Sequence, residues 1–220
     1  MRIFATSDIH GNRKIMDKLN TIAPDVDLLL ICGDIGGKDG RGKTFRQFSE
    51  YQKLDADYLA SVLNEIKTES RFILGNDDWF EYEDSRYLQK AETINGLTLV
   101  PFEYVLLTPF NTNREVNDNK LEYELGKISA DGNTVMVAHA PPLGAGDILY
   151  SGRNCGSCAV RGWIEEVQPK LWLCGHIHED NSAAFIGETL VLNCACEHQN
   201  DILKGWIVDT DTMEFESIEL

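Results

Sequence analysis

Short, almost wholly apolar runs recur along this chain and alternate with stretches of helical spacing. The run from Asp27 to Cys32 is the clearest example and is typical of a strand that is buried on both faces. Before it, residues Lys14 to Ile22 carry apolar side chains three or four positions apart, which predicts an amphipathic helix. Strands and helices that interleave in this way favour an α/β domain.

The same pattern continues to the end of the chain. Further strands are predicted at Arg2–Thr6, Arg71–Leu74, Leu97–Val100, Glu103–Leu107, Thr134–Ala138, Leu171–Cys174, Thr189–Asn193 and Trp206–Asp209. Further helices are predicted at Phe45–Lys67, Glu115–Ile128 and Trp163–Val167. The four glycines between Gly36 and Gly42 predict a mobile loop. No repeat, linker or low-complexity segment interrupts the pattern, so residues 1–220 are predicted to form one domain.

Charge and hydropathy limit the classes of partner. The net charge of −16 disfavours nucleic acid as a partner, because no dense basic cluster offsets it. No apolar stretch is long enough for a membrane helix, and residues 1–8 lack the features of a signal peptide, so we expect a cytoplasmic protein that binds no membrane. The six cysteines need not pair in that compartment.

Five of the predicted strands end in residues that are able to bind metal ions. They are Asp8-Ile9-His10, Gly33-Asp34, Gly75-Asn76-Asp77-Asp78, His139-Ala140-Pro141-Pro142 and Gly175-His176-Ile177-His178. Open α/β sheets bind ligands beyond the carboxyl ends of their strands, so these five loops are expected to converge. Four of the five histidines in the chain lie in them.

The spacing inside the loops suits metal binding. Asp8 and His10 are two residues apart, as are His176 and His178, so each pair faces one side of an extended segment. Carboxylate and imidazole together suit Mn, Fe, Zn or Ni better than Ca, which takes an all-oxygen shell. A glycine before Asp34, Asn76 and His176 permits a sharp turn or a close backbone approach.

In this order, the five motifs resemble those of the calcineurin-like metallophosphoesterases, over Met1 to about Asn193. The resemblance implies a four-layer α/β/β/α sandwich of two mixed β-sheets flanked by helices. It also implies two divalent metal ions and seven ligands. The first ion would be held by Asp8, His10 and His178, the second by Asn76, His139 and His176, and Asp34 would bridge the two. A narrower resemblance points to a prokaryotic and archaeal branch of the family. It lies in Thr108–Thr112 with Glu115 and in the segment from His139-Ala140-Pro141-Pro142 through Gly175-His176-Ile177-His178-Glu179.

The implied activity is hydrolysis of a small phosphate ester by a hydroxide that bridges the two ions, with Mn favoured. We expect Asp34, Asn76, Asp77 and His139 to take part in catalysis. Asp77 departs from the family, because many members have His after the Asn of the third motif. A carboxylate is a poorer partner for phosphate, so phosphodiesters are favoured over monoesters. Asp78 is interpreted as a residue that orients a metal ligand.

Other interpretations stay open. A non-catalytic scaffold of the same fold is disfavoured because no ligand is missing. A nuclease is disfavoured by the negative charge, and a phosphomonoesterase or protein phosphatase is disfavoured by Asp77.

Several residues have both a functional and a plain interpretation, and the plain one is favoured or at least equal for each. These are Cys155 and Cys158 as a redox pair or, with Cys194 and Cys196, a zinc site; Arg114 and Arg153 as phosphate contacts; Trp79 and Phe80 as a stacking surface; and His198, interpreted as a polar loop residue.

Overall fold

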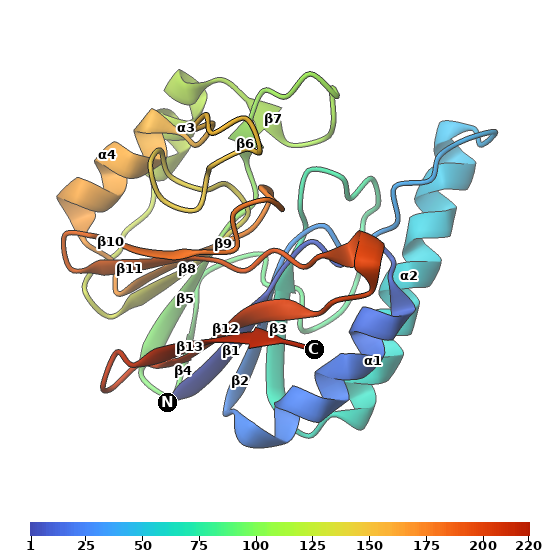
Figure 1. Cartoon of the computed structure of the whole chain (residues 1–220), viewed down its shortest axis with the longest axis horizontal. Helices are drawn as coiled ribbons and strands as arrows, with labels where there is room; N and C mark the ends of the chain where they lie inside the picture. Colours follow the sequence, from blue (N-terminus) through green and yellow to red (C-terminus); the bar gives the residue numbers. More distant parts are fainter.

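The computed structural model describes residues 1–220 and contains two large mixed β-sheets (Figure 1). The first sheet consists, in spatial order, of β13 (Phe215–Glu219), β12 (Lys204–Asp209), β1 (Arg2–Thr6), β2 (Leu28–Cys32) and β3 (Glu69–Ile73). The second consists of β10 (Ala183–Ile186), β11 (Thr189–Asn193), β9 (Leu171–Cys174), β8 (Thr134–Ala138), β5 (Leu97–Phe102) and β4 (Glu92–Ile94). A two-stranded sheet pairs β6 (Val105–Leu106) with β7 (Glu115–Val116).

Four α-helices flank the sheets. They are α1 (Arg13–Ile22), α2 (Phe45–Glu65), α3 (Asp118–Leu125) and α4 (Cys158–Val167). Two 3-10 helices, η1 (Ala23–Asp25) and η2 (His198–Asn200), complete the regular structure. None of the helices is both long and apolar enough to span a membrane.

Alternation of side chains along the strands separates the layers. In β1, Ile3 and Ala5 enter the core between the two sheets, whereas Phe4 packs on the opposite side. In β8, Val135 and Val137 enter the same inner core and Met136 faces away from it. Successive strand residues point to opposite faces, so these mostly apolar strands each contribute to two cores.

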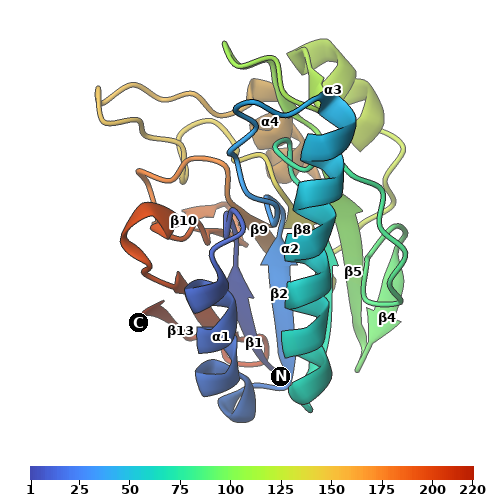
Figure 2. The ribbon, with the colours of Figure 1, turned by 90° about the vertical axis from the view of Figure 1, so that its right-hand side faces the viewer.

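Helices cover the outer face of each sheet. Residues of α1 and α2 pack on the outer face of the first sheet, and those of α3 and α4 on the outer face of the second. Figure 2 shows α1 and α2 in front of β1 and β2. The molecule is therefore the α/β/β/α sandwich of two mixed sheets that the resemblance implied.

The predicted helix Glu115–Ile128 is wrong in its first residues. Glu115 lies in β7 instead, and the helix begins only after Asn117, whose side chain accepts a hydrogen bond from the backbone N–H of Lys120. An asparagine in this position satisfies one of the free N–H groups of the first turn, so it begins the helix there. The sequence also failed to predict three strands at the sheet edges, β4, β10 and β13.

The parallel strands bring the predicted loops to one edge of the sandwich. In the first sheet β1, β2 and β3 run parallel, and in the second β5, β8, β9 and β11 do. The loop after β2 meets the loop after β1 through backbone hydrogen bonds, among them Asp8 N–H to Gly33 C=O at 3.0 Å. The loop after β9 meets the loop after β8, where Gly175 N–H donates to His139 C=O at 3.1 Å.

Candidate metal centre

Four of the seven predicted ligands have a left-handed backbone. Their φ angles are 60° at Asp8, 48° at His10, 54° at Asp34 and 71° at His176. This region costs a residue with a side chain about 1–3 kcal/mol and is concentrated at functional sites. The surrounding loops therefore hold these side chains in directions that a relaxed strand end would not give them.

Two glycines allow the loops to approach this closely. A Cβ atom on Gly75 would collide with the backbone and carboxylate of Asp34, and one on Gly175 would collide with Ser7 and the carboxylate of Asp8. The close approach expected before Asn76 and His176 is confirmed.

The first group of side chains comes from the loops after β1 and β9. His178 Nε2 lies 3.0 Å from Asp8 Oδ1 and 3.2 Å from His10 Nε2. His10 Nε2 is 3.8 Å from Asp8 Oδ1. The second carboxylate oxygen of Asp8 accepts a hydrogen bond from the backbone N–H of His176 at 2.9 Å, which fixes the direction of Oδ1.

The second group comes from the loops after β3, β8 and β9. His139 Nε2 lies 3.0 Å from Asn76 Oδ1, and the rings of His139 and His176 have centroids 5.3 Å apart. The other ring nitrogen of His139 donates to the carbonyl oxygen of Cys32 at 2.7 Å. Metal-bound histidines characteristically make such a bond, because it leaves Nε2 free to bind.

Asp34 lies between the two groups. Its Oδ2 is 3.6 Å from His10 Nε2 and 3.4 Å from His139 Nε2, while Oδ1 accepts the backbone N–H of Asp77 at 2.8 Å. Donor atoms that share one ion at about 2.1 Å are roughly 3.0 to 3.4 Å apart, for tetrahedral or right-angled geometry. The separations among the donor atoms of Asp8, His10, His178, Asn76, His139 and Asp34 fall at or near this range, so these donors fit metal ions. His176 joins them through the contact of its ring with that of His139.

The crowding of these ionisable groups shifts their pKa values. Burial disfavours the charged form of Asp34, but the neighbouring His139 and His10 hold its pKa well below the ordinary range. Burial also opposes a charge on His139, yet Asp34 and Asp8 raise its pKa to about 10. The pKa of His176 falls to about 4 through burial and the nearby His139. Protons and metal ions would compete for the same negative pocket.

Asp78 acts on the backbone beside two of the proposed ligands, Asp34 and Asn76. Its carboxylate contacts no ligand side chain; it accepts backbone N–H groups of Gly75 at 2.8 Å, Gly36 at 2.8 Å and Ile35 at 3.2 Å. It therefore joins the loop after β2 to the loop after β3. Burial and the charge of Asp34 raise its pKa to about 7, against these three hydrogen bonds.

Thr112 contacts the side chain of a proposed ligand directly. Its hydroxyl oxygen accepts a hydrogen bond from Asn76 Nδ2 at 2.7 Å, which leaves Asn76 Oδ1 facing His139. The Thr112 hydroxyl in turn donates to Glu115, whose carboxylate also binds the backbone N–H of Thr112 at 2.8 Å and of Thr108 at 3.1 Å. The Thr108–Thr112 segment with Glu115, noted in the sequence, thus supports a predicted ligand from behind.

A cleft of about 450 Å³ opens over the centre. Asp34, Asn76, Asp77, His176 and His178 line its polar side, together with Lys38 from the glycine-rich loop. Lys38 Nζ forms an ion pair with Asp77 Oδ2 at 3.1 Å. The opposite wall is apolar and carries two exposed side chains, Leu107 and Phe110.

The two open arginine candidates lie in different surroundings. Arg114 is largely buried and donates to Glu103 and to the carbonyl oxygens of Gly75 and Asp78, so it is neither a phosphate contact nor a surface residue. It fastens the loop after β3 from behind. Arg153 is exposed.

The aromatic pair does not line the cleft, and the cysteines form no metal site. Phe80 belongs to the core under α1 and α2, and Trp79 packs against Phe45 with ring centroids 5.6 Å apart. No cysteine belongs to a group of close metal-binding atoms. Cys155 lines the cleft, Cys158 begins α4, and Cys194 and Cys196 are fully buried.

His198 is the residue that the sequence failed to place in the site. Its ring centroid lies 4.4 Å from that of His10 and 4.9 Å from that of His178, so it is no plain loop residue. Burial and His178 lower its pKa to about 4. A signal was present, because η2 follows β11, which is one more parallel strand ending at this edge.

Several known proteins are similar to this chain over most of its length. Protein MJ1162 of Methanocaldococcus jannaschii is 28% identical over 199 residues, which cover 88% of this chain and 87% of that protein. UPF0046 protein K07C11.7 of Caenorhabditis elegans is 26% identical, over 94% of this chain and 74% of its own length. The crystal structure of TT1561 of Thermus thermophilus shares the fold with a TM-score of 0.65, at 16% identity over 99% of this chain and 97% of that one.

The family model described as calcineurin-like phosphoesterase matches residues 1–180, which is most of the chain. Metallophosphoesterases use divalent metal ions, and the side chains able to hold such ions are gathered at the strand ends. The chain therefore belongs to the calcineurin-like phosphoesterase family.

Proposed function

We propose that this protein hydrolyses a small phosphodiester with the help of two divalent metal ions. The observation that carries the proposal is the position of Asp34. One of its carboxylate oxygens lies within 3.6 Å of His10 on one side and 3.4 Å of His139 on the other. A single carboxylate oxygen between two imidazole groups is what a bridging ligand requires.

In this proposal each ion has its own ligands besides Asp34. Asp8, His10 and His178 would hold the first ion, and Asn76, His139 and His176 the second. Bound there, the ions would polarise the phosphate oxygens and lower the pKa of a shared water toward neutrality. The mixed oxygen and nitrogen donors suit Mn²⁺, which we take as the first ion to test.

The protein's own groups would orient the substrate. Lys38 compensates the charge of Asp77, so an entering phosphate meets an ion pair and not a lone carboxylate. Asp77 takes the place at which many family members carry His. Because it is paired with Lys38, it would be a weak proton donor, which favours esters whose leaving group departs without strong acid assistance. The cleft volume of about 450 Å³ is in the range of small-molecule sites.

A diester also makes use of the apolar wall. One ester group would point along the metal centre, and the second would contact Leu107 and Phe110, whose side chains are 67% and 78% exposed. A monoester has no second group to place there. A polymeric nucleic acid is disfavoured as substrate by the net charge of −16.

The test compares bis-p-nitrophenyl phosphate with p-nitrophenyl phosphate, with Mn²⁺ and after chelation. We expect metal-dependent cleavage with a larger kcat/KM for the diester. Asp34→Asn should be inactive, and Asp39→Asn, in the exposed glycine-rich loop, should match the wild type. Preference for the monoester would contradict the substrate class, and no cleavage with Mn, Fe, Zn or Ni would favour a scaffold role.

A further inference from the structure

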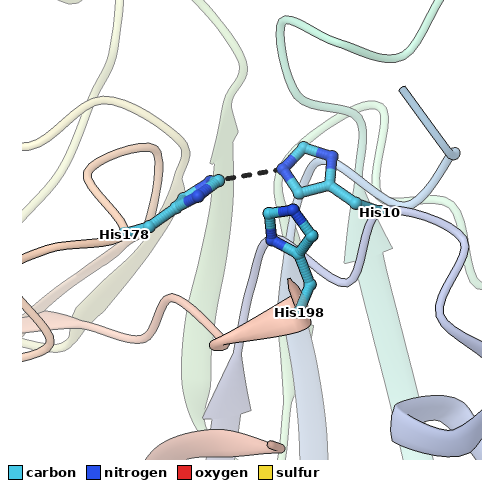
Figure 3. Close-up of side chains that lie close together, drawn as sticks. All are labelled: His10, His178 and His198. Atoms are coloured by element: carbon cyan, nitrogen blue, oxygen red, sulfur yellow. Dashed lines mark hydrogen bonds between the residues drawn. The ribbon is translucent and has the colours of Figure 1, made fainter. Parts of the chain in front are cut away.

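Three imidazole rings converge on the first ion's side of the centre. His10, His178 and His198 come from three separate segments, and their rings point toward one another (Figure 3). A metal-binding nitrogen of each lies within 4.8 Å of those of the other two. The closest pair, His10 Nε2 and His178 Nε2, is 3.2 Å apart.

The segment that carries His198 is fixed to the loop after β1. Ser7 pairs with Ala195, and Cys196 N–H donates to the carbonyl oxygen of Ser7 at 2.9 Å. The Asn12 side chain begins α1 and also donates to the backbone carbonyl of His198 at 2.8 Å. One residue thus holds the loop of His10 and the backbone of His198 in a fixed relation.

No hydrogen bond within the chain accounts for the position of the His198 ring. Its Nδ1 is buried and has no hydrogen-bond partner. A buried polar atom without a partner is costly and calls for an explanation. A packing role would be served as well by a phenylalanine or leucine, which would bury no unpaired nitrogen.

We infer that His198 is a further ligand of the first metal ion, beside Asp8, His10 and His178. The inference rests on the proposed function, because it needs an ion on this side of the centre. With His198 the first ion would meet three imidazoles, whereas the second would meet two and the amide oxygen of Asn76.

This difference predicts different metal preferences for the two sites. Imidazole suits Co, Ni, Zn and Fe, while oxygen ligands suit Mn. The first site should therefore prefer Co²⁺ or Zn²⁺ over Mn²⁺ more strongly than the second site does. Removing His198 should reduce this preference and leave the second site unchanged.

The experiment titrates the whole protein with Co²⁺ and with Mn²⁺ by calorimetry and follows Co²⁺ by its visible absorption. In His198→Ala we expect one of the two Co²⁺ affinities to fall at least about tenfold, with a changed absorption spectrum. The Mn²⁺ affinity of that site should fall less. Gln199→Ala, at the exposed neighbouring position of η2, should behave as the wild type.

The outcomes separate the two claims. If the wild type binds fewer than two ions, the proposed function fails. If it binds two and His198→Ala shows the same Co²⁺ affinities and spectrum, His198 is not a ligand, even where hydrolysis is impaired. Thermal unfolding without metal checks that the variant folds, and His198→Gln, which keeps a polar side chain, replaces it if it does not.

Discussion

The two sides of the candidate metal centre, the first with Asp8, His10 and His178 and the second with Asn76, His139 and His176, are oriented in different ways. On the second side, His139 is held by the Cys32 carbonyl and Asn76 by Thr112, so hydrogen bonds orient both ligands in advance. On the first side, Nδ1 of His10 and Nδ1 of His198 are buried without partners. The left-handed φ angles of Asp8 and His10 direct that side, together with the hydrogen bond from the His176 backbone N–H to Asp8.

An ion should therefore contribute differently to the stability of each side. Ligands already oriented by hydrogen bonds lose little freedom on binding, so the second side should bind its ion without rearrangement. On the first side His10 and His178 share a single contact of 3.2 Å, and Nδ1 of His10 and of His198 has no partner, so the ion itself would have to fix these rings. The first side should therefore be stabilised more by its ion.

Asp34→Asn is the change with the largest expected effect, because it acts on both sides at once. The substitution keeps shape but removes the charge between His10 and His139. A loss of several kcal/mol of charge stabilisation corresponds to about a thousandfold or more in kcat/KM. Steady-state kinetics with bis-p-nitrophenyl phosphate measures it; a loss below tenfold would show that Asp34 does not link the sites.

Thr112→Val should affect the second side alone. The valine keeps the volume but cannot accept the hydrogen bond from Asn76 Nδ2, so the amide is free to turn. Loss of such a supporting contact costs about 10- to 100-fold in metal affinity or activity. Calorimetry should show one weakened ion and one unchanged ion, with the exposed Thr93→Val as control. Equal weakening of both ions would contradict the separation of the sides.

Lys38→Met should reduce activity about tenfold, mainly through KM, and leave both metal affinities nearly unchanged. It removes the cation that pairs with Asp77 but contacts no proposed ligand. A partly exposed ion pair contributes on the order of 1 kcal/mol or less to stability, so the fold should persist. Lys43→Met, in the same loop, is the control; an unchanged KM would place Lys38 outside the substrate's reach.

Glu115 predicts a small pH effect on stability. Burial opposes its ionisation, but hydrogen bonds from Thr108 and Thr112 lower its pKa below the ordinary value of 4.5. Its contribution is therefore complete above pH 4.5 and is lost as the pH falls through the lower, folded-state value. Urea unfolding in chelator between pH 3 and 7 should show a shallower acid loss for Glu115→Gln than for the wild type. Glu81→Gln, at an exposed position, should follow the wild type.

Residue order alone predicted an α/β domain whose polar loops meet at one edge, whereas the four layers and the seven ligands were implied by the family resemblance. All-apolar strands such as β2 required burial on both faces, and the polar residues after them had to meet where parallel strands end. The edge strands were not predicted because they are short or mostly polar and exposed, as β4 and β13 are. The roles of Arg114 and His198 escaped because each depends on contacts between distant segments.

The central claim is that two ions share Asp34. Titration of the chain with Mn²⁺, followed by electron paramagnetic resonance, tests it most directly. We expect two ions per chain and a spin-coupled spectrum in the wild type. In Asp34→Asn the spin-coupled spectrum should be lost. A single ion, or two ions with the spectra of isolated Mn²⁺, would contradict it.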